Sequence, residues 1–195
     1  LAGPLGRPTR IERFGRCIGI GGGVGIAPLY PIVKALKAAG NDVTVLLGAR
    51  TQDLLMLEDE MRKASDRLLV ATDDGTHGRH GFVSALLEDL LKAGERFDLA
   101  GVIGPVPMMK AVSKIAVAAG IRTFASLNPI MIDGTGMCGG CRVTVGGETK
   151  FTCVDGPEFD AARIDWNELV QRLSAYRAQE GASYRAHLCR LEGEQ

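Results

Sequence analysis

Five short apolar runs alternate with four segments of helical periodicity, and this alternation constrains the fold more than any other feature of the sequence. The apolar runs lie at residues 16–20, 42–47, 67–71, 97–103 and 122–125. The helical segments lie at 26–39, 53–63, 82–92 and 107–118. Strands that are apolar along most of their length are typical of a parallel sheet with both faces covered by helices. We therefore expect an α/β fold with a five-stranded parallel, Rossmann-like sheet.

A glycine-rich turn joins the first apolar run to the first helical segment. It reads Gly21-Gly22-Gly23-Val24-Gly25 and continues through Ala27 and Pro28. Glycine lets the backbone approach a pyrophosphate, and the following helix N-terminus offers free N–H groups and the positive end of its dipole. The spacing departs from G-x-G-x-x-G, and a tight turn without a ligand would use the same residues. The strand–turn–helix context favours dinucleotide binding.

A second turn ends the fourth apolar run with Gly104 and Pro105, and Met108 follows in the next helical segment. The carboxyl ends of parallel strands share one edge of the sheet, where open α/β folds bind their ligands. A plain strand end with a proline in the first helical turn is the competing interpretation, and the favoured one for this turn alone. The glycine loop on the same edge supports a role in nucleotide binding.

Charged residues follow the second and third runs on the same expected edge. Arg50 stands where an arginine can meet the 2′-phosphate of NADP, and a solvated surface charge explains it equally well. Asp73 and Asp74 either border the adenosine site or form a turn.

Three of the five cysteines gather in one segment, as Cys138, Cys141 and Cys153, with Asp133 five residues before the first of them. With a cysteine at Asp133, the spacing would be the C-x4-C-x2-C…C of plant-type [2Fe–2S] proteins. Zinc held by three thiolates and a carboxylate, or free buried thiols, are the alternatives. The interleaved glycines and a hairpin expected at 142–152 favour the cluster.

The overall composition excludes several classes of function. Lys+Arg and Asp+Glu both number 23, so the net charge of zero argues against a nucleic-acid binder and a polybasic membrane anchor. No apolar run reaches the roughly 20 residues that a membrane span needs. The odd cysteine count argues against a disulfide framework and for a reducing, cytoplasmic location. We expect Cys17 in the core and Cys189 in the tail.

Six motifs in this order resemble the ferredoxin–NADP reductase superfamily over essentially the whole chain. They are Gly3-Pro4-Leu5-Gly6, the glycine loop at 21–28, Gly48-Ala49-Arg50, Thr72-Asp73-Asp74-Gly75, Gly104-Pro105-Val106-Pro107-Met108-Met109 and the cluster segment through Cys153-Val154-Asp155-Gly156-Pro157. The resemblance is strongest to the iron–sulfur flavoprotein branch. This branch includes the small subunits of NADH-dependent ferredoxin:NADP oxidoreductases (also called sulfide dehydrogenases) and the related electron-transfer subunits of dihydroorotate dehydrogenase B.

The resemblance implies four parts. Residues 1–10 are the end of an FAD-binding barrel that precedes the sequence, which opens at Leu1 without an initiator methionine. Residues 11–127 are the NAD(P)-binding domain, 128–160 the [2Fe–2S] subdomain and 161–195 a helical tail. Asp133, where dihydroorotate dehydrogenase B usually has a cysteine, is similar to the oxidoreductase small subunits, in which an aspartate binds the cluster.

The implied function is electron transfer between NAD(P)H and a larger partner subunit, through FAD and a cluster held by Asp133, Cys138, Cys141 and Cys153. The resemblance favours NAD(H), a partner like the flavoprotein small subunit of glutamate synthase, and possible exchange with ferredoxin. We expect the 195 residues alone to be inactive. The alternatives are a dihydroorotate dehydrogenase B subunit and a non-enzymatic adaptor that binds a nucleotide and zinc.

Overall fold

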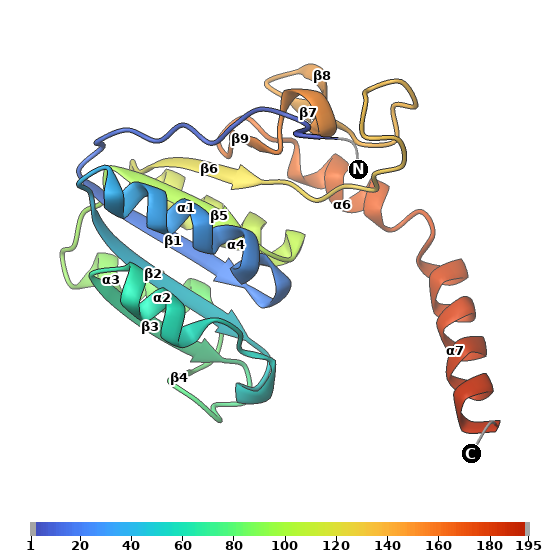
Figure 1. Cartoon of the computed structure of the whole chain (residues 1–195), viewed down its shortest axis with the longest axis horizontal. Helices are drawn as coiled ribbons and strands as arrows, with labels where there is room; N and C mark the ends of the chain where they lie inside the picture. The colour runs from blue at the N-terminus through green and yellow to red at the C-terminus, as the bar shows by residue number, and fades with distance from the viewer. Residues whose placement is uncertain (1–2, 194–195) are drawn as a thin grey trace.

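A computed structural model describes residues 3–193, and a mostly parallel sheet organises its larger part (Figure 1). The strand order is β4-β3-β2-β1-β5-β6-β9, and only β9 runs antiparallel to its neighbour. The strands are β1 (Arg16–Gly22), β2 (Asp42–Ala49), β3 (Arg67–Thr72), β4 (Arg79–His80), β5 (Leu99–Ile103), β6 (Arg122–Ser126) and β9 (Glu158–Asp160). All five expected strands are present, which confirms the α/β fold.

The sheet is wider than expected by one strand at each edge. β4 has two residues and β9 has three, so neither carries an apolar run long enough to mark a strand in the sequence. β9 comes from the segment after the cysteine-rich region and pairs with β6, where Ala125 lies opposite Phe159.

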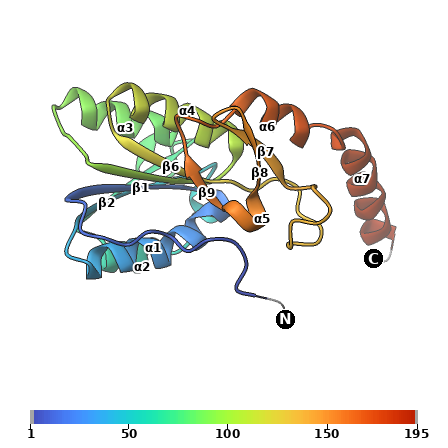
Figure 2. The same cartoon turned by 90° about the horizontal axis from the view of Figure 1, so that it is seen from above.

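Helices cover both faces of the sheet, as expected, and each face has its own apolar core (Figure 2). One face packs against α1 (Ile26–Ala38) and α2 (Glu58–Ala64), which bury Leu29, Val33 and Met61. The other face packs against α3 (Val83–Lys92), α4 (Val106–Ala118) and α6 (Trp166–Leu173).

Two expected helices are interrupted in the structure. The segment 53–63 divides into the short 3-10 helix η2 (Gln52–Leu54) and α2, with Leu57 at φ 55° between them. The apolar residues 55–57 pack against the core on the α1 side, and the helix begins only after them. The expected helical tail at 161–195 is also divided, because α6 ends at Leu173 and a separate helix, α7 (Arg177–Gly193), extends away from the body (Figure 1).

The cysteine-rich segment forms a small subdomain beside β6. The expected hairpin consists of β7 (Arg142–Val145) and β8 (Glu148–Phe151), and its turn residues Gly146 and Gly147 both have positive φ. Two residues at positive φ are what a type I′ hairpin turn requires. The short helix α5 (Thr152–Asp155) follows β8 directly. Thr152 donates its N–H to the carbonyl of Cys141 over 3.1 Å, which fastens α5 to the loop before the hairpin.

The two remaining cysteines lie where the sequence indicated. Cys17 is buried in β1, and this burial raises the pKa of its thiol to about 11. Cys189 is exposed on α7. None of the helices in residues 3–193 is long and apolar enough to cross a membrane.

Candidate functional site

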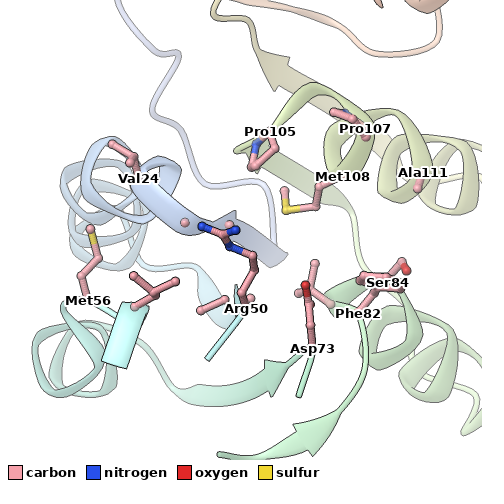
Figure 3. A pocket seen from close by; sticks show the side chains of 16 residues that line it. Val24, Arg50, Met56, Asp73, Phe82, Ser84, Pro105, Pro107, Met108 and Ala111 are labelled. Carbon is pink, nitrogen blue, oxygen red and sulfur yellow. The ribbon is translucent and has the colours of Figure 1, made fainter. Parts of the chain in front are cut away.

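A cavity of about 760 Å³ opens along the carboxyl edge of the sheet (Figure 3). It lies where β1 and β5 are neighbours and the strand order reverses, which is the ligand-binding position of open α/β sheets. Seven of the residues singled out in the sequence line it: Gly22, Gly23, Val24, Arg50, Asp73, Pro105 and Met108. The structure therefore brings together signals that lie far apart in the chain.

Three of the singled-out glycines serve close packing beneath the cavity instead of lining it. A Cβ on Gly21 would lie 2.9 Å from Leu29 of α1, so this glycine lets the helix approach β1. A Cβ on Gly25 would lie 2.5 Å from the carbonyl oxygen of Ile103, and one on Gly104 would lie 3.1 Å from the carbonyl oxygen of Gly22. The two turns thus touch each other through their glycines.

Three further candidates also lie outside the cavity lining. Ala27 and Pro28 are exposed in the first turn of α1. Asp74 forms a turn, because its Oδ1 accepts hydrogen bonds from the N–H of Thr76 at 3.0 Å and from its hydroxyl at 2.7 Å. These bonds hold the pKa of the Asp74 carboxyl below its ordinary value.

A positive charge and an open stretch of backbone both face the cavity. Figure 3 shows the Arg50 guanidinium group in the middle of the cavity, between Val24 on one side and Asp73 and Met108 on the other. The Arg50 side chain makes no hydrogen bond or ion pair with any residue that the structure describes. Gly23 has φ 53° and open space where a Cβ would stand. Together with the N-terminus of α1, this arrangement suits an anionic phosphate group.

Sequence reasoning missed the apolar part of the cavity. The lining residues that the sequence did not mark as site residues are Gly48, Ala49, Leu54, Met56, Phe82, Val83, Ser84, Pro107 and Ala111. Of these, Gly48, Ala49 and Pro107 appeared only within the motifs of the resemblance. Phe82 is 69% exposed just before α3, and a large exposed aromatic ring beside a cavity is a candidate surface for a planar ring of a ligand. Its position depends on how α3 returns to the end of β2, which no local pattern reveals.

In the cluster segment, Cys141 and Cys153 form a buried pair. Their sulfur atoms lie 3.2 Å apart, and both side chains are buried. The hairpin between them brings them together, since Arg142 and Phe151 pair across β7 and β8.

Asp133 and Cys138 form a second, exposed pair. One carboxylate oxygen of Asp133 accepts the N–H of Cys138 at 2.8 Å, and the other accepts the N–H of Thr135 at 2.9 Å. These two backbone hydrogen bonds lower the pKa of the Asp133 carboxyl, with the bond from Thr135 having the larger effect. The carboxylate is therefore ionised at neutral pH, and its remaining lone pairs are available to a metal.

The two pairs distinguish between the metal centres considered for this segment. Within residues 3–193, no three His, Cys, Asp or Glu side chains gather around one point that would hold a single metal ion. Structural zinc needs four donors around one ion. A [2Fe–2S] cluster takes two protein donors on each of its two irons, so separate pairs fit it. The pairing of the donors favours the cluster over tetrahedral zinc.

Two arginine side chains form hydrogen bonds with the loop that connects Cys138 to Cys141. Arg142 donates to the carbonyl of Gly139 at 3.1 Å, and Arg172 of α6 donates to the carbonyl of Gly140 at 3.2 Å. Sequence reasoning did not single out Arg172, because it lies 32 residues after Gly140 and carries no motif.

Comparisons with known proteins match the two segments of the chain in which the candidate sites lie. Residues 128–165 match the family described as the iron–sulfur cluster binding domain of dihydroorotate dehydrogenase B, and residues 20–114 match an oxidoreductase NAD-binding domain. A solved structure of an NADH-dependent reduced ferredoxin-NADP oxidoreductase superposes with a TM-score of 0.88 and 50% identity, over 96% of this chain and 67% of the other.

Curated relatives extend the comparison to several organisms. A dihydroorotate dehydrogenase B (NAD(+)) electron transfer subunit homolog of Thermotoga maritima is 53% identical over 96% of this chain. A probable electron transfer subunit of the same enzyme from Methanopyrus kandleri is 36% identical over 86% of it. The chain spans 66% of the length of the first relative and 62% of the second.

Proposed function

Because the chain belongs to the iron–sulfur flavoprotein branch of the ferredoxin–NADP reductase superfamily, with its NAD-binding and iron–sulfur domains, we propose that it is part of an electron-transfer subunit. The observation that carries the proposal is the sorting of four donors into two pairs, Asp133 with Cys138 and Cys141 with Cys153. A cavity large enough for a nucleotide on the same chain provides a site for the electron donor or acceptor.

The carboxyl-edge cavity is the proposed nucleotide site. The backbone at Gly22 and Gly23 and the N-terminus of α1 receive the pyrophosphate, and Arg50 adds positive charge. The nicotinamide lies toward Pro105 and Met108. We propose NAD(H) as the nucleotide, since NAD(+) or NADH appears in the names of the relatives. Arg50 then serves the pyrophosphate or the adenosine.

The cluster segment is the proposed [2Fe–2S] site. Asp133, Cys138, Cys141 and Cys153 would hold the cluster, with one pair of donors available to each of its two irons. When bound, the cluster accepts and releases electrons singly. The chain orients the donors through the N–H groups of Thr135 and Cys138, and it shields the buried cysteine pair from water.

The rest of the protein completes the proposed route. Residues 1–10 end an FAD-binding domain, 11–127 bind the nucleotide, 128–160 bind the cluster, and 161–195 form the tail. A larger oxidoreductase subunit in the cytoplasm, similar to the flavoprotein small subunit of glutamate synthase, exchanges electrons with the cluster. A dihydroorotate-oxidising subunit is the second candidate partner, because several relatives carry that name. Identification of the subunit that co-purifies with the native protein separates the two.

Two variants at one position test the cluster assignment. Asp133→Ala removes a donor, so we expect a labile cluster and loss of iron. Asp133→Cys replaces oxygen with sulfur, so the iron should remain while the EPR signal and the reduction potential change. Iron analysis and EPR on both variants beside the parent protein check this. An unaltered spectrum in both variants would show that Asp133 only caps the loop. A colourless parent protein with one bound zinc would contradict the electron-transfer proposal as a whole.

A further inference from the structure

The first described residues are fastened to the cluster subdomain before the chain reaches the sheet. The Arg7 N–H donates to the carbonyl of Gly156 over 2.6 Å, and the Arg7 guanidinium lies 3.6 Å from the Asp155 carboxylate. Thr9 donates its hydroxyl to Glu158 over 2.6 Å. Every hydrogen bond and ion pair found for the described residues 3–9 goes to the segment 155–158.

Close packing accompanies these bonds on both sides of the cluster segment. Gly6 has φ 75°, and a Cβ there would lie 2.5 Å from the carbonyl oxygen of Gly156. On the other side, a Cβ on Gly134 would lie 2.9 Å from Cδ1 of Leu5. Gly134 directly follows Asp133, and Gly156 is three residues after Cys153. Residues 5–7 therefore touch the loop beside the first proposed ligand and the turn beside the last.

The chain reaches the inner strands of the sheet only further on. The N–H groups of Phe14 and Gly15 donate to Oδ1 of Asn41 over 2.6 and 3.0 Å, and Ile11 and Phe14 pack against the core on the α1 side. Residues 3–9 thus bond to the segment 155–158, which ends in the edge strand β9, whereas residues 11–15 bond and pack against the chain beside β1 and β2.

We propose that residues 3–9 are a strap that fixes the cluster loop against the flavin-binding domain, with Leu5, Gly6 and Arg7 as positioning residues. The inference rests on the proposed function, in which that domain directly precedes this segment. Because residues 5–7 contact the chain beside Asp133 and beside Cys153, the strap holds both ends of the cluster segment at a fixed position relative to the domain that precedes it. Electron transfer over a fixed gap needs such a constraint, since a small displacement of one reacting partner is costly.

A matched pair of glycine substitutions tests the strap in the full-length protein with its partner subunit. Gly6 and Gly120 have φ 75° and 77°, so alanine meets the same backbone strain at both positions. Only at Gly6 does the added Cβ meet another part of the chain, because Gly120 has open space around it.

Stopped-flow absorbance after mixing with NADH separates flavin reduction from cluster reduction. We expect Gly6→Ala to slow cluster reduction at least tenfold while flavin reduction and iron content stay normal, and Gly120→Ala to leave both rates unchanged. Cluster reduction within twofold of the parent rate in Gly6→Ala would overturn the strap.

A second variant keeps the proposal testable if Gly6→Ala does not fold. The double variant Leu5→Ala with Arg7→Gln removes two strap contacts without strain, and Arg10→Gln is the control because Arg10 pairs only with nearby Glu12. We expect faster amide hydrogen exchange over 133–141 in the double variant alone. Unchanged exchange in a cluster-loaded protein would overturn the strap and leave the proposed function standing. A parent protein without iron would instead contradict the proposed function.

Discussion

The glycine loop at the nucleotide cavity and the glycine-rich loop of the cluster segment use the same residue for different reasons. Beside the cavity, Gly21 and Gly25 have no positive φ, and neighbouring atoms leave no room for a Cβ. In the cluster loop, Gly134, Gly136 and Gly139 have φ 76°, 86° and 66°, which side chains other than glycine rarely adopt. Lack of space requires glycine at Gly21 and Gly25 of the first loop, whereas at the three positions of the second loop it is mainly the backbone conformation.

Because of this difference, substitutions in the two loops should have different consequences, for stability in one and for cluster binding in the other. The cavity loop is part of the packed core between β1, α1 and β5, so most changes there act on stability. The cluster loop is largely exposed, and arginine side chains and the strap hold it in place. Changes in the cluster loop should therefore act on the cluster while the sheet stays folded.

Loss of a buried thiol should have the largest effect of the changes considered. It should remove the cluster and leave nucleotide binding intact. Cys153→Ala removes one member of the 3.2 Å pair, so we expect loss of nearly all bound iron. Nucleotide binding measured by calorimetry should stay within twofold of the parent. Cys189→Ala, at an exposed cysteine on α7, is the control and should keep its iron. Iron retained in Cys153→Ala would remove this cysteine from the ligand set.

Gly25→Val should be the most destabilising change in the cavity loop. Its Cβ would lie 2.5 Å from the Ile103 carbonyl oxygen, which is backbone and cannot rotate away. Overpacking of this kind costs about 3 kcal/mol in the free energy of unfolding. Denaturant unfolding measures this change in the free energy of unfolding. A decrease of less than about 1 kcal/mol would show that the turn at Gly25 can move away from the turn at Gly104 at little cost.

Gly23→Val should act on the ligand more than on the packing. No atom lies within 4 Å of a Cβ at this position, yet the residue lines the cavity. We expect nucleotide affinity to fall about tenfold, or roughly 1.4 kcal/mol, because the side chain obstructs the pyrophosphate. The φ of 53° adds a stability cost of about 1–2 kcal/mol. Calorimetry on the folded variant measures the nucleotide affinity. An unchanged affinity would show that the pyrophosphate does not bind at Gly23.

Arg172→Gln should shift the cluster potential without releasing the cluster. Removal of a positive charge beside Gly140 disfavours the added electron, so the potential should become more negative. A half-buried charge at the surface is worth about 1 kcal/mol, which is roughly 40 mV for a one-electron couple. Redox titration measures the shift, with Arg177→Gln on α7 as the control. Equal potentials in both variants would leave Arg172 with a structural role only.

The smallest expected effect is a pH dependence at the strap. Burial raises the pKa of Glu158 above its ordinary value of 4.5, and the hydrogen bond from Thr9 partly opposes this. The folded protein therefore holds this proton more tightly than the unfolded chain does. The contribution of Glu158 to stability is greatest below pH 4.5 and is lost as the pH rises through the folded-state pKa. Glu158→Gln should reduce the dependence of the melting temperature on pH in this range. The same pH dependence in the variant and the parent would show that Glu158 titrates normally.

Much of the architecture follows from the sequence because its signals are local. The spacing of apolar residues predicts the five inner strands and the helices between them, and Gly146-Gly147 predicts the hairpin. The four candidate ligands also come from spacing alone. These features depend on residues close together in the chain, so neighbouring side chains and backbone preferences are enough to specify them.

Tertiary structure alone decided the features that join distant segments. β9 pairs with β6 across a subdomain, and Phe82 reaches the cavity because α3 returns to the end of β2. The division of the ligands into two pairs, the contact of Arg172 with Gly140 and the strap on residues 155–158 likewise join residues that no periodicity relates. Such contacts form only once the whole chain is packed, because their free energy comes from surfaces that meet through the fold.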